Sequence, residues 1–524
     1  MARTDGKIAL YSTIWLIANE LRGKVDGWDF KAYVLGTIFY RYISENLTRY
    51  INELQREAGV DGFDYSKCSD EEVESAKEQL VDEKGFFILP SMLFCNVAKD
   101  ADTNDRLNET LSKVFIYIES SAIGAESEAK LRGLFSDFII DNSKLGRSVS
   151  ERNKMFASVI RAVKDMKLSE TLSDNDNDVF GDAYEFLMSM YASQAGKSGG
   201  EFFTPQEVSC VLARISAHGN DNIESVYDPA CGSGSLLLKF KKVNEQRRKH
   251  GNARTIKYYG QEINPTTFNL CRINMFLHDI NYNNFDIRYG DTLLHPQHLG
   301  MDFDAIVSNP PYSLKWEGKQ NPLLINDLRY SPAGVLAPKN AADLAFAMHM
   351  LYHLKESGTC SIVEFPGVLY RGGAERQIRK YLLEYNFVDT IIQLPQNLFY
   401  GVAIATCIIV LRKGKRPDNN VLFIDASEQF VKKGNKNVLS QENQDAIVDA
   451  YKKRENVQYF SKLVPASEVI ANDCNLSVSS YVEKEDKREP IDIVAVNDRL
   501  EELVQRGNFL RETIDMYIKN TETE

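Results

Sequence analysis

The segment Asn309-Pro310-Pro311-Tyr312 has the residue types and order that point most directly to chemistry. An exocyclic amine on a base is a poor nucleophile, because its lone pair is delocalised into the ring. The side-chain oxygen of Asn309 and the backbone oxygen of Pro310 can accept from such an amine and localise that lone pair. The prolines fix the backbone, and Tyr312 can stack on a base taken out of its helix. We interpret Asn309, Pro310, Pro311 and Tyr312 as candidate catalytic residues for methylation of an amine.

A glycine-rich segment, Asp228-Pro229-Ala230-Cys231-Gly232-Ser233-Gly234-Ser235, lies between an apolar run and a helical pattern. Glycines at a strand-to-helix turn let a ligand approach the backbone, and the helix N-terminus offers free N–H groups. The spacing is not GxGxxG, so it does not indicate a dinucleotide. Gly196-Lys197-Ser198 resembles the end of a phosphate-binding loop, but Tyr191 stands where that loop needs glycine, which argues against ATP.

Three acidic residues, Asp228, Glu262 and Asp291, end or follow three consecutive predicted strands. Parallel strands bring such residues to one crevice at the carboxyl edge of a sheet. Glu262 suits hydrogen bonds to ribose hydroxyls, and Asp291 could accept from an adenine amino group. The pattern therefore indicates adenosine without phosphates, as in S-adenosylmethionine.

The segment just before the glycine turn, residues 201–206, has two interpretations. Thr204-Pro205 is a good helix start, with threonine as the N-cap. The segment could also form a lid over the methionine end of the donor. The predicted cofactor-binding residues are Glu201, Phe202, Phe203, Thr204, Pro205, Gln206, Asp228, Gly232, Ser233, Gly234, Ser235, Glu262 and Asp291. We expect no metal site.

The order of the predicted elements indicates an α/β fold. From about residue 220 to 412, short apolar runs alternate with helical patterns, which predicts a mainly parallel sheet. The predicted strands are 225–227, 256–259, 285–289, 305–307, 360–365, 388–393 and 404–411, and the last two are expected to form an antiparallel hairpin at one edge. We expect a helical domain over 1–165, the catalytic domain over 166–480, and a partner-binding helical tail over 481–524 with an a/d seam interrupted by Gly507.

The composition limits the partners. The chain has 524 residues and a net charge of −12, which argues against gripping DNA alone with a broad basic face. A basic cluster is either a solvated helix face or a phosphate-facing strip: Lys239, Lys241, Lys242, Arg247, Arg248, Lys249 and Lys257. Eight cysteines, without a CxxC pair, indicate a reducing cytosol. The longest apolar run, 402–411, is too short to span a membrane.

Together these segments resemble amino-methylating DNA methyltransferases of the gamma order. More closely, nearly the whole chain resembles the modification (M) subunit of a type I restriction-modification system. The resemblance also rests on residues 28–31, 40–46, 182–186, 197–205, 333–338, 366–375 and 475–481. Cys231 departs from the pattern, because many relatives carry alanine there, and this small change should not abolish donor binding.

The resemblance implies a Rossmann-like methyltransferase core and S-adenosylmethionine as the donor. It also implies N6-methyladenine as the product, within a bipartite site in double-stranded DNA. The adenine would be flipped onto Tyr312, with Phe399 or Tyr400 as a second contact. A separate specificity subunit would choose the site, two M subunits would bind one specificity subunit, and a restriction subunit would join for cleavage.

Two other classes of function remain open from the residues. One is an amine methyltransferase that acts on RNA bases or on protein glutamine, since the NPPY segment also suits those amines. The other is a catalytically inactive scaffold that binds DNA or a partner. The large N-terminal helical region argues against the first, and the intact Asn309, Tyr312 and Glu262 argue against the second.

Overall fold

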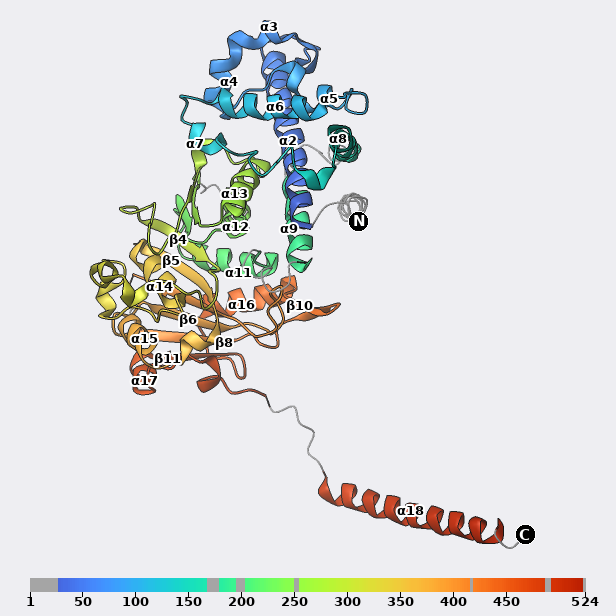
Figure 1. Cartoon of the computed structure of the whole chain (residues 1–524). Helices are drawn as coiled ribbons and strands as arrows, with labels where there is room; N and C mark the ends of the chain where they lie inside the picture. The colour runs from blue at the N-terminus through green and yellow to red at the C-terminus, as the bar shows by residue number, and fades with distance from the viewer. Residues whose placement is uncertain are drawn as a thin grey trace. The chain divides into compact units, whose positions relative to one another are not determined.

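The computed structural model describes residues 27–166, 179–194, 203–248, 254–414, 418–485 and 492–521. The chain forms two compact units, residues 1–482 and residues 483–524. Figure 1 shows the first unit with its helical N-terminal region in blue and its sheet in green to orange. No helix of the described residues is both long and apolar enough to cross a membrane.

The N-terminal region is helical, as predicted. Its helices are α2 (Gly27–Glu57), α3 (Asp70–Val73), α4 (Lys77–Lys84), α5 (Phe94–Val97), α6 (Leu107–Ser121), α7 (Glu128–Leu131) and α8 (Val149–Lys164). The apolar stripe of α2 is buried, and α8 begins at a capping box formed by Ser148 and Glu151. The ring of Phe39 on α2 lies 6.1 Å from that of Phe276 on α13 (Pro265–Leu277), so apolar contacts join this region to the catalytic core.

The first unit contains a nine-stranded sheet. Its strands are β1 (Ser225–Asp228), β2 (Lys257–Glu262), β3 (Phe285–Tyr289), β4 (Phe303–Ser308), β5 (Leu354–Glu364), β6 (Val388–Gln393), β7 (Cys407–Arg412), β8 (Asn420–Asp425) and β11 (Ser461–Pro465). The order across the sheet is β11-β8-β6-β7-β5-β4-β1-β2-β3. Within this nine-stranded sheet only β7 and β11 run antiparallel to their neighbours, so the predicted α/β class with a mainly parallel sheet is confirmed.

One detail of the predicted topology is wrong. Strands β6 and β7 do pair antiparallel, but they lie inside the sheet, because β8 and β11 extend it beyond β6. Residues of β7 alternate between two cores: Ile408 and Val410 pack on one face, and Ile409 and Leu411 pack on the other. A strand buried on both faces has a continuous apolar sequence, so that sequence does not distinguish an interior strand from an edge strand.

Helices cover both faces of the sheet. One face packs against α11 (Gln206–Ala217), α12 (Ser235–Arg248), α13 and α16 (Gln441–Lys453), whose core continues into the N-terminal region. The other face packs against α14 (Asp343–Tyr352), α15 (Ala374–Glu384) and α17 (Ala466–Ala471). This sandwich leaves the loops at the carboxyl edge of the strands to carry the site.

Part of the predicted basic cluster is engaged inside the protein. Lys239 on α12 forms a 3.2 Å ion pair with Glu185 on α9 (Val179–Gln194), and both side chains are buried. Lys241 donates to the backbone oxygen of His278. These two lysines therefore join helices, which leaves them unsuited to a phosphate-facing strip.

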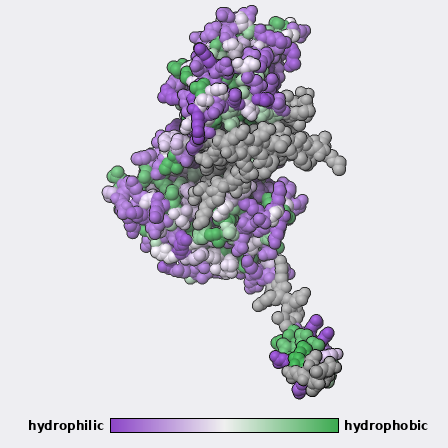
Figure 2. All heavy atoms as spheres, turned by 45° about the vertical axis from the view of Figure 1, so that its right-hand side comes forward, coloured by the Kyte–Doolittle hydropathy of each residue, from purple (hydrophilic) through white to green (hydrophobic). Residues whose placement is uncertain are grey.

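The second compact unit contains α18 (Ile493–Thr521). The predicted seam residues Leu500, Leu503, Leu510 and Ile514 are each more than half exposed on this helix. Figure 2 shows apolar side chains at its surface, in green. The helix is confirmed, and its role in binding a partner stays a prediction.

Candidate active site

The carboxyl ends of four parallel strands bring the predicted site together. Asp228 lies beside Gly260 in the β1–β2 register, and Glu262 lies beside Tyr289 in the β2–β3 register. The strand order reverses at β1, between β4 and β2, which is where α/β sheets bind ligands. A pocket of about 380 Å³ opens at this edge. Its lining residues are Pro229, Ala230, Gly232, Gln261, Glu262, Ile263, Asn264, Thr267, Gly290, Asp291, Thr292, Asn309, Pro311, Leu314 and Phe346.

The glycine turn and Glu262 hold each other in place. The backbone N–H of Gly232 donates to Glu262 Oε2 at 2.9 Å, and that of Asn264 donates to Oε1 at 2.8 Å. Each carboxylate oxygen keeps a second lone pair for a ligand. Burial raises the pKa of Glu262 above its ordinary value. The turn therefore presents a partly buried carboxylate at the pocket, with geometry fixed by the backbone.

Asp228 lies beneath the turn and is fully buried. Its Oδ1 accepts from the backbone N–H of Ala230 at 3.0 Å and from the Ser308 hydroxyl at 2.8 Å. Its Oδ2 is buried without a hydrogen-bond partner among the described residues. Burial raises the pKa of this carboxyl to about 7. Asp228 therefore ties β1 to β4 and retains one oxygen with no hydrogen bond.

This arrangement predicts a specific pH dependence of stability. The pKa of Asp228 is about 7 in the folded state and 3.8 ordinarily, so between these values the folded protein binds more protons than the unfolded chain. Stability from this group falls as pH rises through that window. Asp228→Asn removes the ionisation, so the difference in melting temperature, variant minus parent, should rise between about pH 5 and about pH 8. If the difference in melting temperature stayed constant over this pH range, the raised pKa of Asp228 would be contradicted.

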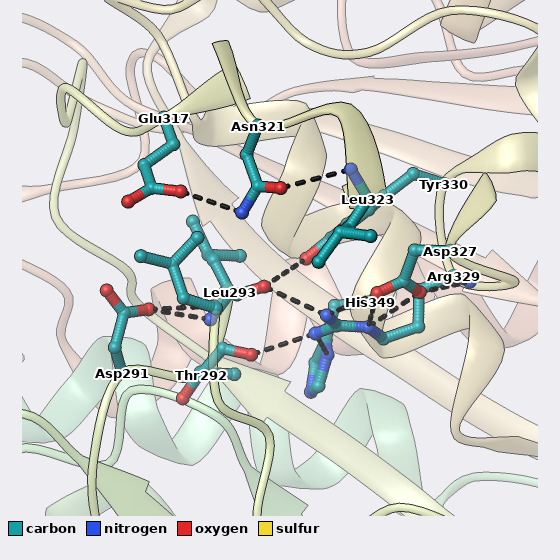
Figure 3. Close-up of polar contacts among 11 residues, drawn as sticks. Asp291, Thr292, Leu293, Glu317, Asn321, Leu323, Asp327, Arg329, Tyr330 and His349 are labelled. Carbon is teal, nitrogen blue, oxygen red and sulfur yellow. Dashed lines mark hydrogen bonds and ion pairs between the residues drawn. The ribbon is translucent and has the colours of Figure 1, made fainter. Parts of the chain in front are cut away.

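Asp291 is held by its own loop and by a buried arginine. Its Oδ1 accepts from the backbone N–H groups of Leu293 and Leu294, and Figure 3 shows its other oxygen pointing away from this turn. Arg329, which is 2% exposed, donates to the backbone oxygens of Thr292 and Leu293 at 2.8 and 2.9 Å. Its guanidinium therefore fixes the loop that carries Asp291.

The contacts of Arg329 also fix the tautomer of the His349 ring. Arg329 lies 3.1 Å from His349 Nδ1, and a guanidinium can only donate, so Nδ1 accepts. The proton then lies on Nε2, which is 3.1 Å from the hydroxyl of Tyr227. Burial lowers the pKa of His349 well below its ordinary value, so the ring stays neutral. This buried network joins the long loop after the NPPY segment to α14 and β1.

Arg329→Lys should weaken binding of the cofactor about tenfold, because one ammonium group cannot bridge both loop carbonyls and Asp327. Calorimetric titration with S-adenosylmethionine measures the effect. Arg379→Lys is the matched control: Arg379 is also buried and donates to the backbone oxygens of Cys474 and Val368, away from the pocket. The control should lower stability and leave cofactor affinity unchanged. If Arg329→Lys and Arg379→Lys bound S-adenosylmethionine with equal affinity, the positioning role of Arg329 would be refuted.

Asn309 is buried and held by two side chains. Its amide nitrogen donates to the Thr204 hydroxyl at 3.1 Å, and its Oδ1 accepts from the Tyr312 hydroxyl at 2.7 Å. Burial raises the pKa of Tyr312 well above its ordinary value, so the phenol remains a donor. Together Thr204 and Tyr312 set the amide so that Oδ1 acts as an acceptor.

The predicted helix cap at Thr204 is wrong. Helix α11 begins at Gln206 with Pro205 in the N-cap position, and no side chain caps it. The Thr204 hydroxyl is turned to Asn309 instead. The Thr204 hydroxyl therefore makes a tertiary contact with Asn309 and does not cap helix α11.

The structure separates the predicted residues into three groups. Gly232, Glu262, Asp291, Asn309 and Pro311 line the pocket. The predicted residues that are described but are not among the lining residues are Phe203, Thr204, Pro205, Gln206, Asp228, Ser233, Gly234, Ser235, Pro310 and Tyr312. Glu201 and Phe202 lie outside the described residues.

Several lining residues escaped sequence reasoning. Ile263 follows Glu262 and is 60% exposed, an unusual position for an apolar side chain beside a pocket. Phe346 and Leu314 come from α14 and from the loop after the NPPY segment. The position of Ile263 directly after a strand-ending acid was an available signal. Phe346 lies in a helix that is buried from Asp343 to Leu351, where only tertiary structure shows which side chain reaches the pocket.

Comparisons with known proteins agree with this geometry. Residues 175–490 match the model of the N-6 DNA methylase family, and residues 10–163 match that of the HsdM N-terminal domain. The chain is 43% identical over 537 residues to the type I restriction enzyme MpnII methylase subunit of Mycoplasma pneumoniae, covering 100% of this chain and 98% of that protein. It is 34% identical to the MjaVII methylase subunit of Methanocaldococcus jannaschii over 69% of this chain and 62% of that one.

A solved structure has the same fold across most of the chain. It is the type I restriction-modification methyltransferase subunit from Streptococcus thermophilus, with a TM-score of 0.80 and 34% sequence identity. The match covers 91% of this chain and 100% of that chain. A second structure, from work on complex assembly in the type I restriction-modification system, has a TM-score of 0.62 at 21% identity and supports the fold alone.

Proposed function

The chain belongs to the N-6 DNA methylase family, as an adenine-specific methyltransferase subunit of the type I restriction-modification class, and we propose that the pocket at the carboxyl edge of its sheet performs the transfer. This membership favours DNA over the RNA and protein substrates that the residues alone left open. The fold and family are those of S-adenosylmethionine-dependent methyltransferases. The proposal assigns the groups within the pocket.

The pocket residues fit S-adenosylmethionine. A volume of about 380 Å³ lies within the usual range for ligand sites. Glu262 offers the remaining lone pairs of a fixed carboxylate to the ribose hydroxyls, and Asp291 Oδ2 suits the adenine amino group. The exposed side chain of Ile263 would be covered by the adenine ring. When bound, this donor supplies an electrophilic methyl group on a positively charged sulfur.

The residues around Asn309 would prepare the amine of a flipped adenine. Asn309 Oδ1 and the Pro310 backbone oxygen accept its two hydrogens and turn the nitrogen lone pair toward the methyl group. With the donor bound, the N–C bond would form as the C–S bond breaks, the C–S electrons would remain on sulfur, and the extra proton would leave the nitrogen for water. Orientation supplies much of the rate, so no strong base is needed.

The observation that carries the proposal is the setting of Asn309. Its amide lines the pocket and is oriented by the Thr204 and Tyr312 contacts, within the same pocket as Glu262 and Asp291. A buried amide held in this way is preorganised to accept from a substrate amine, and electrostatic preorganisation is usually the largest single contribution to catalysis.

The test is transfer of labelled methyl from S-adenosylmethionine to DNA, with and without the specificity subunit. We expect labelled N6-methyladenine only when that subunit is present. Transfer without it would show that this chain carries its own recognition surface. Transfer to RNA or protein, or donor binding without any transfer, would refute the proposed reaction.

We further propose the division of labour between subunits. Two copies of this chain would bind one specificity subunit that selects a site in double-stranded DNA, and a restriction subunit would join for cleavage. The proposed domains of this chain are a helical region over 1–165, a catalytic region over 166–480 and a partner-binding tail over 481–524. The eight cysteines are all free thiols, which suits action in the reducing cytoplasm.

The apolar seam of α18 suits the specificity subunit as its partner. Leu503→Asp together with Leu510→Asp places charge in the seam and should weaken association with that subunit about 100-fold or more. Gln505→Asp with Asn508→Asp is the matched control, since these positions lie on the opposite side of the helix. Analytical ultracentrifugation of the mixed subunits measures association. Equal weakening by both pairs would contradict the seam as the interface.

A further inference from the structure

A short basic hairpin follows the carboxyl end of β8, at the edge of the sheet that carries the proposed catalytic pocket, and sequence reasoning did not single it out. Strands β9 (Val431–Lys433) and β10 (Lys436–Val438) pair antiparallel around Gly434 and Asn435. Residues 429–441 contain three lysines and no acidic residue, in a chain whose net charge is −12. Figure 1 shows the hairpin projecting from the part of the molecule where α11 and α16 lie.

Topology places the hairpin at the same edge as the pocket. Strands β4, β5, β6 and β8 all run in one direction, so their carboxyl ends share an edge. The backbone N–H of Ala426, just after β8, donates to the oxygen of Gln393 at the end of β6. The hairpin follows from this point. It is therefore built onto the catalytic edge of the sheet.

Specific contacts attach the hairpin to the loop after β6. Asn397 donates to the backbone oxygen of Asn435 at 2.6 Å, and Asn437 donates to that of Gln396 at 2.9 Å. The ammonium group of Lys436 lies 3.0 Å from the centre of the Tyr400 ring. These contacts hold the hairpin in one position relative to Tyr400.

A short chain of contacts leads from there to Asn309. The ring of Tyr400 lies 6.4 Å from that of Phe203, and the next residue, Thr204, is hydrogen-bonded to Asn309. The hairpin is therefore a few side chains away from the amide that would receive the flipped base. A flipped base remains attached to its own phosphate, so the neighbouring backbone must pass close to the pocket mouth.

The lysines of the hairpin repel one another, and the carboxyl of Glu207 acts on two of them. Lys433 and Lys436 are directly opposite in the register, and like charges in this position destabilise a strand pair. Burial lowers the pKa of Lys436 to about 8. The ammonium of Lys436 is buried without a hydrogen-bond partner among the described residues, and the nearby carboxyl of Glu207 has its pKa raised by burial. A phosphate beside the exposed Lys432 and Lys433 would add a second anion and offset the repulsion between Lys433 and Lys436.

We propose that the β9–β10 hairpin binds the DNA backbone next to the flipped adenine, with Lys432 and Lys433 contacting phosphates and Lys436 docking the hairpin on Tyr400. This inference rests on the proposed function and names a contact of the same site. Lys432 and Lys433 are exposed, and no ion pair involves them in the described part of the chain. The chain has a net charge of −12, and these lysines would give it local positive charge where a polyanionic substrate binds.

The test compares two lysine pairs in the assembled complex with the specificity subunit. Lys432→Gln with Lys433→Gln removes the proposed contacts. Lys452→Gln with Lys453→Gln makes the same charge change at the opposite edge of the sheet. That location follows from the next residue, Arg454, which contacts Asp389 and the backbone oxygen of Asn420, near the starts of β6 and β8.

DNA affinity is measured over a series of salt concentrations, on a duplex carrying the site mapped from genomic N6-methyladenine. The hairpin pair should weaken binding about tenfold and reduce the slope of log affinity against log salt by about 1 to 2. The control pair should change neither quantity, and Lys432→Arg with Lys433→Arg should restore the slope. Affinity for S-adenosylmethionine should stay that of the parent, and the melting temperature should not fall, because Lys433→Gln removes the repulsion from Lys436.

Other outcomes overturn the inference. Equal slopes for the hairpin pair and the parent would exclude a phosphate contact, and equal reduction by both pairs would indicate a general charge effect. Loss of the specificity subunit with an unchanged slope would make the hairpin a protein interface. The parent complex is assayed for methylation of the same duplex, so failure of the proposed function would be seen separately.

Discussion

Asn309→Ala is expected to lower the rate of methyl transfer about 10²- to 10³-fold, with little change in affinity for S-adenosylmethionine. The substitution removes the Oδ1 that accepts from the adenine amine, an interaction that strengthens as the lone pair turns toward the methyl group. An interaction made in the transition state appears in kcat. Single-turnover transfer of labelled methyl to DNA, in the complex with the specificity subunit, measures the loss.

Two further variants separate this role from packing. Asn153 is buried to the same extent, 6% exposed, and lies in the N-terminal region. Asn153→Ala should lower stability and leave the transfer rate unchanged. Tyr312→Phe keeps the ring but removes the donor that orients Asn309 Oδ1, so the rate should fall about tenfold. A parental rate for Asn309→Ala, or a rate loss as large for Asn153→Ala, would refute the catalytic assignment.

Gly234→Ala should destabilise the protein by about 2 to 5 kcal/mol and weaken cofactor binding. Gly234 has φ of +80°, where a Cβ costs about 1–2 kcal/mol. That Cβ would lie 2.8 Å from Cys271 Sγ and 2.9 Å from Met275 Cε, and such overpacking costs about 1–3 kcal/mol more. Denaturant unfolding measures stability, and calorimetry measures affinity for S-adenosylmethionine.

Gly300→Ala provides the matched control. Gly300 has nearly the same φ, +79°, and among the described residues no non-neighbouring atom lies within 4 Å of the Cβ that alanine would add. The control should therefore show only the backbone cost of about 1–2 kcal/mol and keep parental cofactor affinity. If both variants lost the same stability, the contact of the glycine turn with α13 would not matter.

The sequence by itself determined the class of the fold and the elements that carry the site. All seven predicted runs are strands, because β-branched and aromatic residues in short runs between turn residues favour extended backbone. The position of Asp228, Glu262 and Asp291 at one edge of the sheet follows from the strand prediction, because parallel strands connected by helices end at the same edge. The local sequence pattern was therefore enough to predict the position of residues that depend only on their own strand.

Sequence reasoning missed β8, β11 and the β9–β10 hairpin. The apolar run of β8 is only Val421 to Ile424, between polar residues, and such short runs have no distinctive periodicity. Without these strands, the β6–β7 pair was wrongly placed at an edge. Whether a strand lies inside a sheet depends on which strands pair with it, and pairing partners can be far away in the sequence.

Only the tertiary structure decided the contacts within the site. The hydroxyl of Thr204 meets Asn309, which is 105 residues away, and Arg329 reaches the loop that carries Asp291, 36 to 37 residues before it. Neither contact follows from spacing, because a side chain has several rotamers and the packing of distant elements selects among them. The sequence therefore determined which groups carry the chemistry, and the packing of distant segments decided how they are oriented.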